Sequence, residues 1–162
     1  MAMTATVSDL TLRDAEGRDA PALAALMNTL AVATQSSPGV MTAEAVREGP
    51  MAMASMRLRV AVRGDTVLGY TLTSPAYETA FAQRGRYMSD LAVAENARRQ
   101  GVGQALIRDA ARLTAAEGGR FLWWVVMPSN TEALALYDRY DGICETLQCR
   151  AIFGAPFEAL LA

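Results

Sequence analysis

Residues 90–107 read DLAVAENARRQGVGQALI, and this stretch decides the fold. A strand over residues 87–93 runs into a loop with the order R-x-x-G-x-G, formed by Arg98, Gly101 and Gly103. A helix follows directly, because its apolar residues recur on one stripe with polar residues on the opposite face. Strand, loop and helix in this order predict the first half of a parallel crossover.

The glycine loop has the properties of an anion site. The first amides of a helix have no partner inside it and carry partial positive charge. Glycines let a diphosphate approach these amides, and the paired arginines add charge-assisted bonds. The loop therefore predicts a pyrophosphate cradle, with an ordinary βα turn as the competing interpretation. A Rossmann dinucleotide site is disfavoured because its fingerprint needs a third glycine.

The chain after this loop continues the alternation of strands and helices. Residues 121–127 form an unbroken apolar run, typical of a strand covered on both faces. Ser129 and Glu132 have capping-box spacing before a helix over residues 131–140. Residues 143–153 are expected to supply one or two closing strands.

The chain before the loop predicts strands and two helices. Asp19 is the expected N-cap of the first helix, with Pro21 in its first turn, and residues 36–39 end it. Pro75 is expected to end a later strand, and residues 77–86 to form an irregular connection. The other expected elements are strands over residues 10–13, 58–62 and 67–72 and a second helix over residues 42–50.

These elements indicate an α/β (α+β) fold, with a mixed central sheet of about six to seven strands flanked by helices. The chain has 162 residues, of which 52% are apolar. That length and composition suit a single domain over residues 1–162. Residues 1–7 are expected to be flexible.

Composition excludes several kinds of chemistry. The chain has no histidine, and its 15 basic residues are all arginine. Ser-His-Asp catalysis, His-ligated zinc and Schiff-base chemistry are therefore excluded. The spacing of Cys144 and Cys149 fits no metal motif, so no metal is expected.

The charge pattern also limits the partners. The net charge of −2 is spread along the chain, so no basic face for nucleic acid or an anionic membrane is expected. Residues 1–7 lack the features of a signal peptide, and no apolar run approaches a membrane span. These patterns predict a cytoplasmic protein.

From about Leu58 to its C-terminus, the sequence resembles the GCN5-related N-acetyltransferase family. The resemblance rests on residues 90–93, on the glycine loop, and on the pattern N-x-x-A-x-x-x-Y from Asn130 to Tyr137. Residues 90–93 and 150–161 look most like the polyamine (spermidine/spermine) acetyltransferase branch. The resemblance implies an acyl-CoA N-acyltransferase fold, acetyl-CoA as co-substrate and a possible homodimer.

The resemblance also implies where acetyl-CoA binds. Backbone groups of Leu91 and Val93 would bond the pantetheine, and an amide there would stabilise the oxyanion of the acetyl carbonyl. Amides of residues 100–104 would hold the pyrophosphate, and the Asn130 side chain would reach the pantetheine while also capping its helix. The expected cofactor-binding residues are Leu91, Ala92, Val93, Arg98, Arg99, Gln100, Gly101, Val102, Gly103, Gln104, Asn130, Ala133 and Tyr137.

The expected catalytic residues are Tyr137, Asp90 and Glu78. By resemblance, Tyr137 is the general acid that protonates the leaving thiolate, with a role as a core aromatic residue as the alternative. Asp90 is the best-placed base, and Glu78 is a second candidate acting through water. Polyamine-type relatives carry a glutamate before that aspartate, where this chain has Ser89.

The predicted function is an N-acetyltransferase that moves acetyl from acetyl-CoA to the primary amine of a small molecule. Transfer would be direct, in a ternary complex without a covalent enzyme intermediate. Two alternatives stay open, namely a non-catalytic acyl-CoA-binding regulatory module and a protein N-terminal or antibiotic acetyltransferase. Residues expected to line the acceptor pocket are Met51, Met53, Met56, Tyr77 and Phe81.

Overall fold

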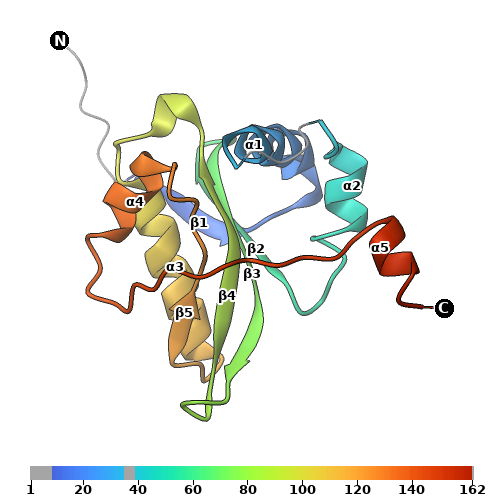
Figure 1. Cartoon of the computed structure of the whole chain (residues 1–162). Coiled ribbons are helices and arrows are strands. Elements are labelled where there is room, and N and C mark those ends of the chain that lie inside the picture. The colour runs from blue at the N-terminus through green and yellow to red at the C-terminus, as the bar shows by residue number, and fades with distance from the viewer. Residues whose placement is uncertain (1–8, 35–38, 162) are drawn as a thin grey trace.

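The computed structural model describes residues 9–34 and 39–161, and within them one five-stranded sheet runs in the order β1-β2-β3-β4-β5 (Figure 1). The first four strands are antiparallel neighbours, and β5 lies parallel to β4. The strands are β1 (Thr11–Asp14), β2 (Arg57–Arg63), β3 (Thr66–Glu78), β4 (Gln83–Val93) and β5 (Phe121–Trp123).

Helices cover both faces of the sheet, so the predicted α/β fold is confirmed. On one face, α1 (Ala20–Ala33) and α2 (Ala43–Glu48) enclose a core with the fully buried Leu23, Val60 and Tyr70. On the other face, α3 (Val102–Ala116) packs Val102 and Leu106 against the sheet. The remaining helical segments are η2 (Gly17–Asp19), η3 (Glu95–Ala97), α4 (Thr131–Tyr137) and α5 (Ala155–Glu158).

The start of α1 follows the prediction in position but not in mechanism. Asp19 occupies the N-cap position, yet its side chain makes no capping hydrogen bond. Its carboxylate instead accepts from Arg13 at 2.6 Å and from the Glu16 amide at 2.7 Å. The guanidinium of Arg13 lowers the pKa of Asp19, so the pair ties β1 to the helix as ions. The expectations for residues 1–7 and for a break at residues 36–38 lie outside the described residues.

The β3–β4 hairpin is longer than the sequence predicts. β3 continues through Pro75 to Glu78, and the region expected to be irregular is the far end of this hairpin. The β2 ladder on the other side of β3 ends at Thr73. Pro75 therefore lies where β3 is an edge strand, and a missing N–H is tolerated there.

The C-terminal part has fewer strands than expected, which explains a count of five rather than six or seven. β5 stops at Trp123, and Trp123, Val125 and Met127 are 42–51% exposed, so the run is not covered on both faces. Residues 143–153 form no strand and cross the molecule as an extended segment toward α5 (Figure 1). This segment pairs with no other strand within the described chain.

Candidate active site

A cavity of about 460 Å³ opens at the carboxyl end of β4. Its walls come from α1, the end of β4, the loop before α3, the start of α3, and α4. All the expected cofactor-binding residues except Gln100 line it. The structure thus brings residues 91–93, 98–104 and 130–137 of the sequence around one space.

The loop that precedes α3 presents backbone amides to this cavity. Gly101 has φ +82°, a left-handed conformation that glycine adopts at little cost. The first bond of α3 runs from the Ala105 amide to the Gly101 carbonyl. Helix geometry therefore leaves the amides of residues 102–104 without carbonyl partners in α3, and they lie in the cavity wall. This is the geometry of an anion cradle.

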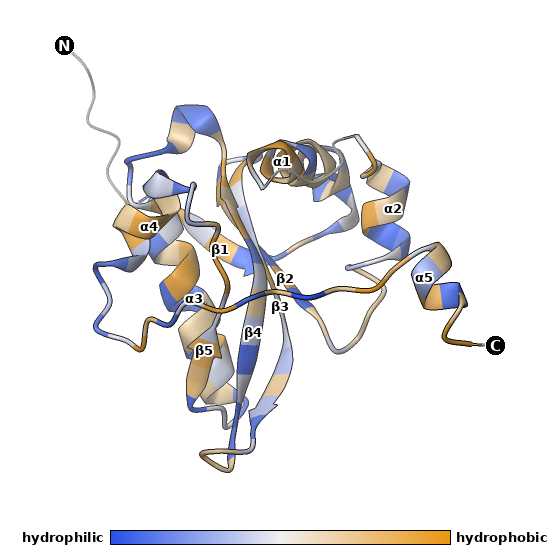
Figure 2. Cartoon of the chain, viewed as in Figure 1, coloured by the Kyte–Doolittle hydropathy of each residue, from blue (hydrophilic) through white to orange (hydrophobic). Residues whose placement is uncertain are grey.

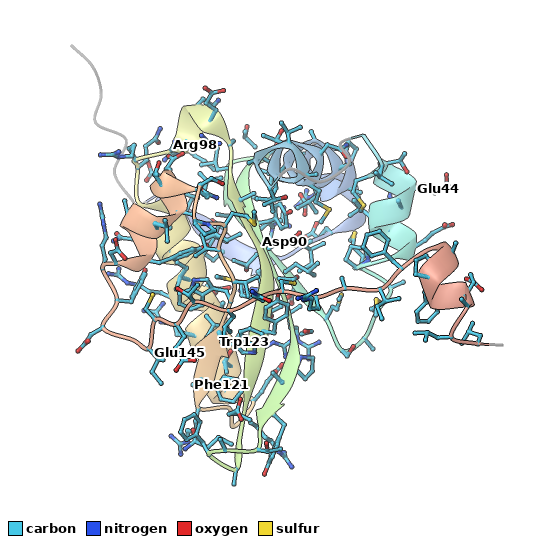
Figure 3. The ribbon with its side chains drawn as sticks, in the orientation of Figure 1. Glu44, Asp90, Arg98, Phe121, Trp123 and Glu145 are labelled. Atoms are coloured by element: carbon cyan, nitrogen blue, oxygen red, sulfur yellow. The ribbon has the colours of Figure 1, made fainter. Side chains whose placement is uncertain are left out.

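The polar side chains of the loop have different environments. Arg98 forms a 3.0 Å ion pair with Glu132 of α4, so it joins two walls of the cavity near the top of the molecule (Figure 3). Arg99 has φ +62°, an uncommon conformation for a residue with a Cβ. The Gln100 side chain turns away to donate to the Asn96 carbonyl at 2.8 Å. Gln100 therefore shapes the loop rather than the cavity.

β4 and β5 separate below the cavity. Their parallel ladder joins only residues 85–87 of β4 to residues 121–123 of β5. Beyond Tyr87, the β5 side of β4 has no strand partner among the described residues. Leu91, Ala92 and Val93 border the cavity where the two chains separate.

α4 supplies the opposite wall. Asn130 caps this helix as predicted, because its side chain accepts from the Ala133 amide at 3.1 Å, and Ser129 lies one residue before the cap. Tyr137 is the last residue of α4, and its ring packs against that of Trp124 with 5.0 Å between the ring centroids. Burial raises the pKa of Tyr137 to about 12. Its hydroxyl therefore stays protonated at neutral pH and can donate.

A β-bulge at Ser89 determines where Asp90 points. Opposite the consecutive residues Leu72 and Thr73, β4 places Asp90 and Met88, so Ser89 is an extra residue. Strict alternation would put Asp90 on the same face as Arg86. Arg86 is buried on the α3 side, where it pairs with Glu117 at 2.6 Å. The bulge instead turns Asp90 to the α1 side.

On the α1 side, Asp90 meets Tyr70. The Tyr70 hydroxyl donates to the Asp90 carboxylate at 2.8 Å, and Tyr70 itself is fully buried. Burial raises the pKa of Asp90, although hydrogen bonds from Tyr70 and Ser89 oppose the rise. Asp90 lies three residues before the end of β4, below α1 in the view of Figure 3. It is the residue directly before the part of β4 that borders the cavity.

Glu78 does not join this site. It lies at the end of β3, opposite Gln83, where its carboxylate accepts from the Ala80 amide at 3.0 Å. From Gln83 to Asp90, β4 extends on the order of 20 Å. Tyr77 and Phe81 of the same hairpin end are about 60% exposed.

The expected methionine residues line a different cavity. Met51, Met53 and Met56 border a space of about 250 Å³ near the start of β2. The larger cavity lies at the other end of the sheet, because β2 and β4 both run antiparallel to β3. These three residues therefore do not line the larger cavity, and their place in an acceptor pocket stays a prediction.

Two contacts of the site went unpredicted: Trp124 packs on Tyr137, and Tyr70 donates to Asp90. The helix α1 also forms one wall of the cavity. Trp124 lies in the predicted apolar run, but its contact depends on where α4 returns. The Tyr70 contact depends on strand register and on the bulge, which no local pattern signals. The α1 residues in the wall are Leu26, Thr29, Leu30 and Ala33.

No helix in residues 9–34 and 39–161 combines the length and apolar character that crossing a membrane requires. In the same ranges, no three or more Cys, Asp or Glu side chains cluster in a way that could hold a metal ion.

Comparisons with known proteins agree with the geometry. A family model described as the Acetyltransferase (GNAT) family matches residues 32–142. L-ornithine N5-acetyltransferase NATA1 from Arabidopsis thaliana is 30% identical over 73 residues. That match covers 45% of this chain and 32% of the plant protein, so the chain spans about a third of this curated relative's length.

Solved structures share the fold at low sequence identity. An aminoglycoside acetyltransferase, meta-AAC0020 from an uncultured soil metagenomic sample, has a TM-score of 0.72 at 17% identity, covering 91% of this chain and 97% of its own. A ribosomal-protein-alanine N-acetyltransferase from Brucella melitensis biovar Abortus 2308 has a TM-score of 0.73 at 16% identity, covering 90% and 99%. At these identities the likeness concerns the fold alone.

Proposed function

Since the chain belongs to the GNAT acetyltransferase family, we propose that it transfers acetyl from acetyl-CoA to the primary amine of a small molecule. The observation that carries this proposal is one cavity lined both by residues 101–104 at the start of α3 and by Tyr137 of α4. The amides of residues 102–104 hold the pyrophosphate, and Leu91 and Val93 contact the pantetheine through their backbone. Residues 1–162 form one catalytic domain.

Tyr137 acts as the general acid. When the amine nitrogen bonds to the acetyl carbonyl carbon and the C–S bond breaks, the leaving thiolate takes the hydroxyl proton of Tyr137. A pKa of about 12 keeps that proton in place until the thiolate forms. The phenolate then recovers a proton from the amide nitrogen of the product through water. Trp124 fixes the ring in the orientation that this transfer needs.

Asp90 acts as the general base. An ammonium acceptor loses one proton to the Asp90 carboxylate, and the neutral amine attacks. Asp90 later releases this proton to solvent, so one proton leaves per turnover. A carboxylate whose pKa burial raises is a stronger base than one on the surface. Glu78 takes no part, because it lies at the far end of the hairpin.

The walls near Asp90 favour an acceptor with an apolar portion. α1 carries no charged side chain along its length, and Leu26 and Leu30 face the cavity. The helix α1 would offer no counter-ion to a fully charged polyamine. We therefore place acceptors of lower net positive charge ahead of spermidine, such as ornithine, whose carboxylate offsets one of its two ammonium groups, although the polyamine branch remains the sequence resemblance.

Calorimetry and a thiol-release assay test the function. We expect acetyl-CoA to bind at micromolar concentration, and coenzyme A to be released on adding one member of an amine panel. The panel includes ornithine, spermidine, an aminoglycoside and a peptide with N-terminal alanine, with products identified by mass spectrometry. Absence of acetyl-CoA binding would refute the proposal, whereas binding without turnover on any amine would favour the regulatory module.

We also propose that the protein is a homodimer. Every residue from 141 to 161 is exposed, and the apolar side chains of Ile143 and Phe153 are 81% and 78% exposed. Figure 2 shows hydrophobic residues at intervals along this segment. β5 is an edge strand of the sheet within the described chain. One chain thus holds both an unpaired strand edge and an unpaired extended segment. Two copies related by a two-fold axis would satisfy both at once.

Light scattering after size-exclusion chromatography tests the dimer. We expect the measured molar mass of the wild-type protein to be twice that of one chain. For an Ile143→Asp/Phe153→Asp double variant, we expect the molar mass of a single chain. Val40→Asp is the matched control, because Val40 is 66% exposed but lies outside the C-terminal segment. A wild type that is monomeric at high micromolar concentration contradicts the proposal.

A further inference from the structure

Tyr70 is a buried polar residue that takes no direct part in the acetyl transfer proposed for Tyr137 and Asp90. It lies on β3, its side chain is fully buried in the core beneath α1, and its hydroxyl donates to Asp90 at 2.8 Å. A phenylalanine would fill nearly the same volume without a polar atom in the core. The hydroxyl is therefore retained at a position where packing alone does not require it.

We propose that Tyr70 is a positioning residue that sets the proton affinity and orientation of the Asp90 carboxylate for its role as general base. This inference rests on the proposed function. It goes beyond that function because it assigns control of the base to Tyr70, a residue on the neighbouring strand that does not line the cavity.

The geometry supports this assignment. Tyr70 pairs with Ala92 in the ladder, so Asp90 is its diagonal neighbour on the same face. The bulge at Ser89 brings Asp90 to that face. If Ser89 were instead paired regularly with β3, the side chains of Tyr70 and Asp90 would lie on opposite sides of the sheet. A hydrogen bond from a fully buried phenol holds one carboxylate oxygen in place. Ser89 also hydrogen-bonds the carboxylate, but Ser89 is exposed, so the buried phenol is the firmer of the two restraints.

Few other ionisable groups face Asp90. α1 carries none along its length, and β5 carries none. Tyr87 on β4 is the other titratable neighbour, and its pKa is raised mainly by burial and also by the charge of Asp90. Arg86, the closest cation along β4, is on the α3 side with Glu117. Tyr70 is thus the group whose loss changes the carboxylate most directly.

Burial and the hydroxyl of Tyr70 change the pKa of Asp90 in opposite directions. Burial raises the pKa of Asp90, and the hydrogen bond from Tyr70 lowers it by stabilising the charged form. When the hydroxyl of Tyr70 is removed, the hydrogen bond that lowers the pKa of Asp90 is lost, so burial raises this pKa further. Because the base must be ionised, activity would then begin at higher pH.

The test is the pH profile of kcat/KM for wild type and Tyr70→Phe. We expect the acid limb of the variant to move up by about one pH unit. Incorporating 3-fluorotyrosine at position 70 keeps the shape and strengthens the donor, so its acid limb should move down. Val60→Ala is the control, because Val60 is the cross-strand neighbour of Tyr70 in the same core and its loss weakens packing only.

The outcomes separate this inference from the proposed function. Asp90→Asn should abolish the acid limb, and if it leaves the profile unchanged, Asp90 is not the base and the proposed function fails there. If Asp90→Asn abolishes the limb while both changes at Tyr70 leave it in place, the inference alone is overturned. Carbon-13 NMR titration of the Asp90 carboxyl gives the same comparison without turnover. Equal midpoints in wild type and Tyr70→Phe would contradict the coupling.

Discussion

Tyr137→Phe is expected to lower kcat by about 10²- to 10⁴-fold, the usual contribution of a positioned general acid. The variant removes one oxygen and keeps the ring that packs on Trp124. Substrate binding should change little, because the hydroxyl acts on the thiolate only as the C–S bond breaks. Steady-state kinetics with the acceptor found in the amine panel provide the measurement.

Tyr140→Phe is the matched control for this experiment. Tyr140 follows Tyr137 by three residues, is absent from the cavity wall, and has a buried hydroxyl without a hydrogen-bond partner in the structure. Removing an unpaired buried hydroxyl should leave kcat within about twofold and stability equal or higher. Equal kcat values for wild type and Tyr137→Phe would mean that water protonates the thiolate. Tyr137 would then be a core aromatic residue.

Gly101→Ala is expected to weaken acetyl-CoA binding by about 10- to 100-fold. Gly101 has φ +82° at the start of α3, and a Cβ there favours a different loop conformation. Moving the loop withdraws amides that would bond the pyrophosphate, and each bond to a charged group is worth about 1.5–3 kcal/mol. Calorimetry with acetyl-CoA measures the loss.

Gly118→Ala separates this effect from general destabilisation. Gly118 has φ +80°, and a Cβ there meets no atom within 4 Å. It lies at the other end of α3, about 24 Å from Gly101. Both variants should lose a similar ~1–2 kcal/mol of folding stability, but only Gly101→Ala should bind acetyl-CoA more weakly. Similar affinities for the two variants would contradict a phosphate cradle at residues 101–104.

Local sequence patterns predicted the elements that depend on neighbours in the chain. The strand, glycine loop and helix over residues 90–107 could be predicted because capping, turn geometry and helical periodicity all act within a few residues. The cap at Thr42 is of the same kind, since its side chain accepts from the Ala45 amide. These features place the cavity at the end of β4.

Features that depend on register or on distant segments could not be predicted. Pro75 looked like the end of a strand, because no local signal shows that β2 stops before reaching it. Residues 143–153 have the apolar content of strands, but a strand forms only where an edge is available to pair with. The contact between Tyr70 and Asp90 required both the alignment of β3 with β4 and one inserted residue.

Ser89 divides β4 into two parts that each alternate regularly. It is exposed, and its hydroxyl donates to the Leu72 carbonyl at 3.2 Å and also hydrogen-bonds the Asp90 carboxylate. Deleting Ser89 would make Met88 and Asp90 consecutive residues opposite Thr73 and Leu72, so the carboxylate would stay on the α1 side beside Tyr70. Keeping Ser89 but pairing it regularly would instead carry the carboxylate to the side of the sheet that holds Arg86. A strand one residue shorter could therefore hold the base equally well, whereas a strand of the present length needs the bulge.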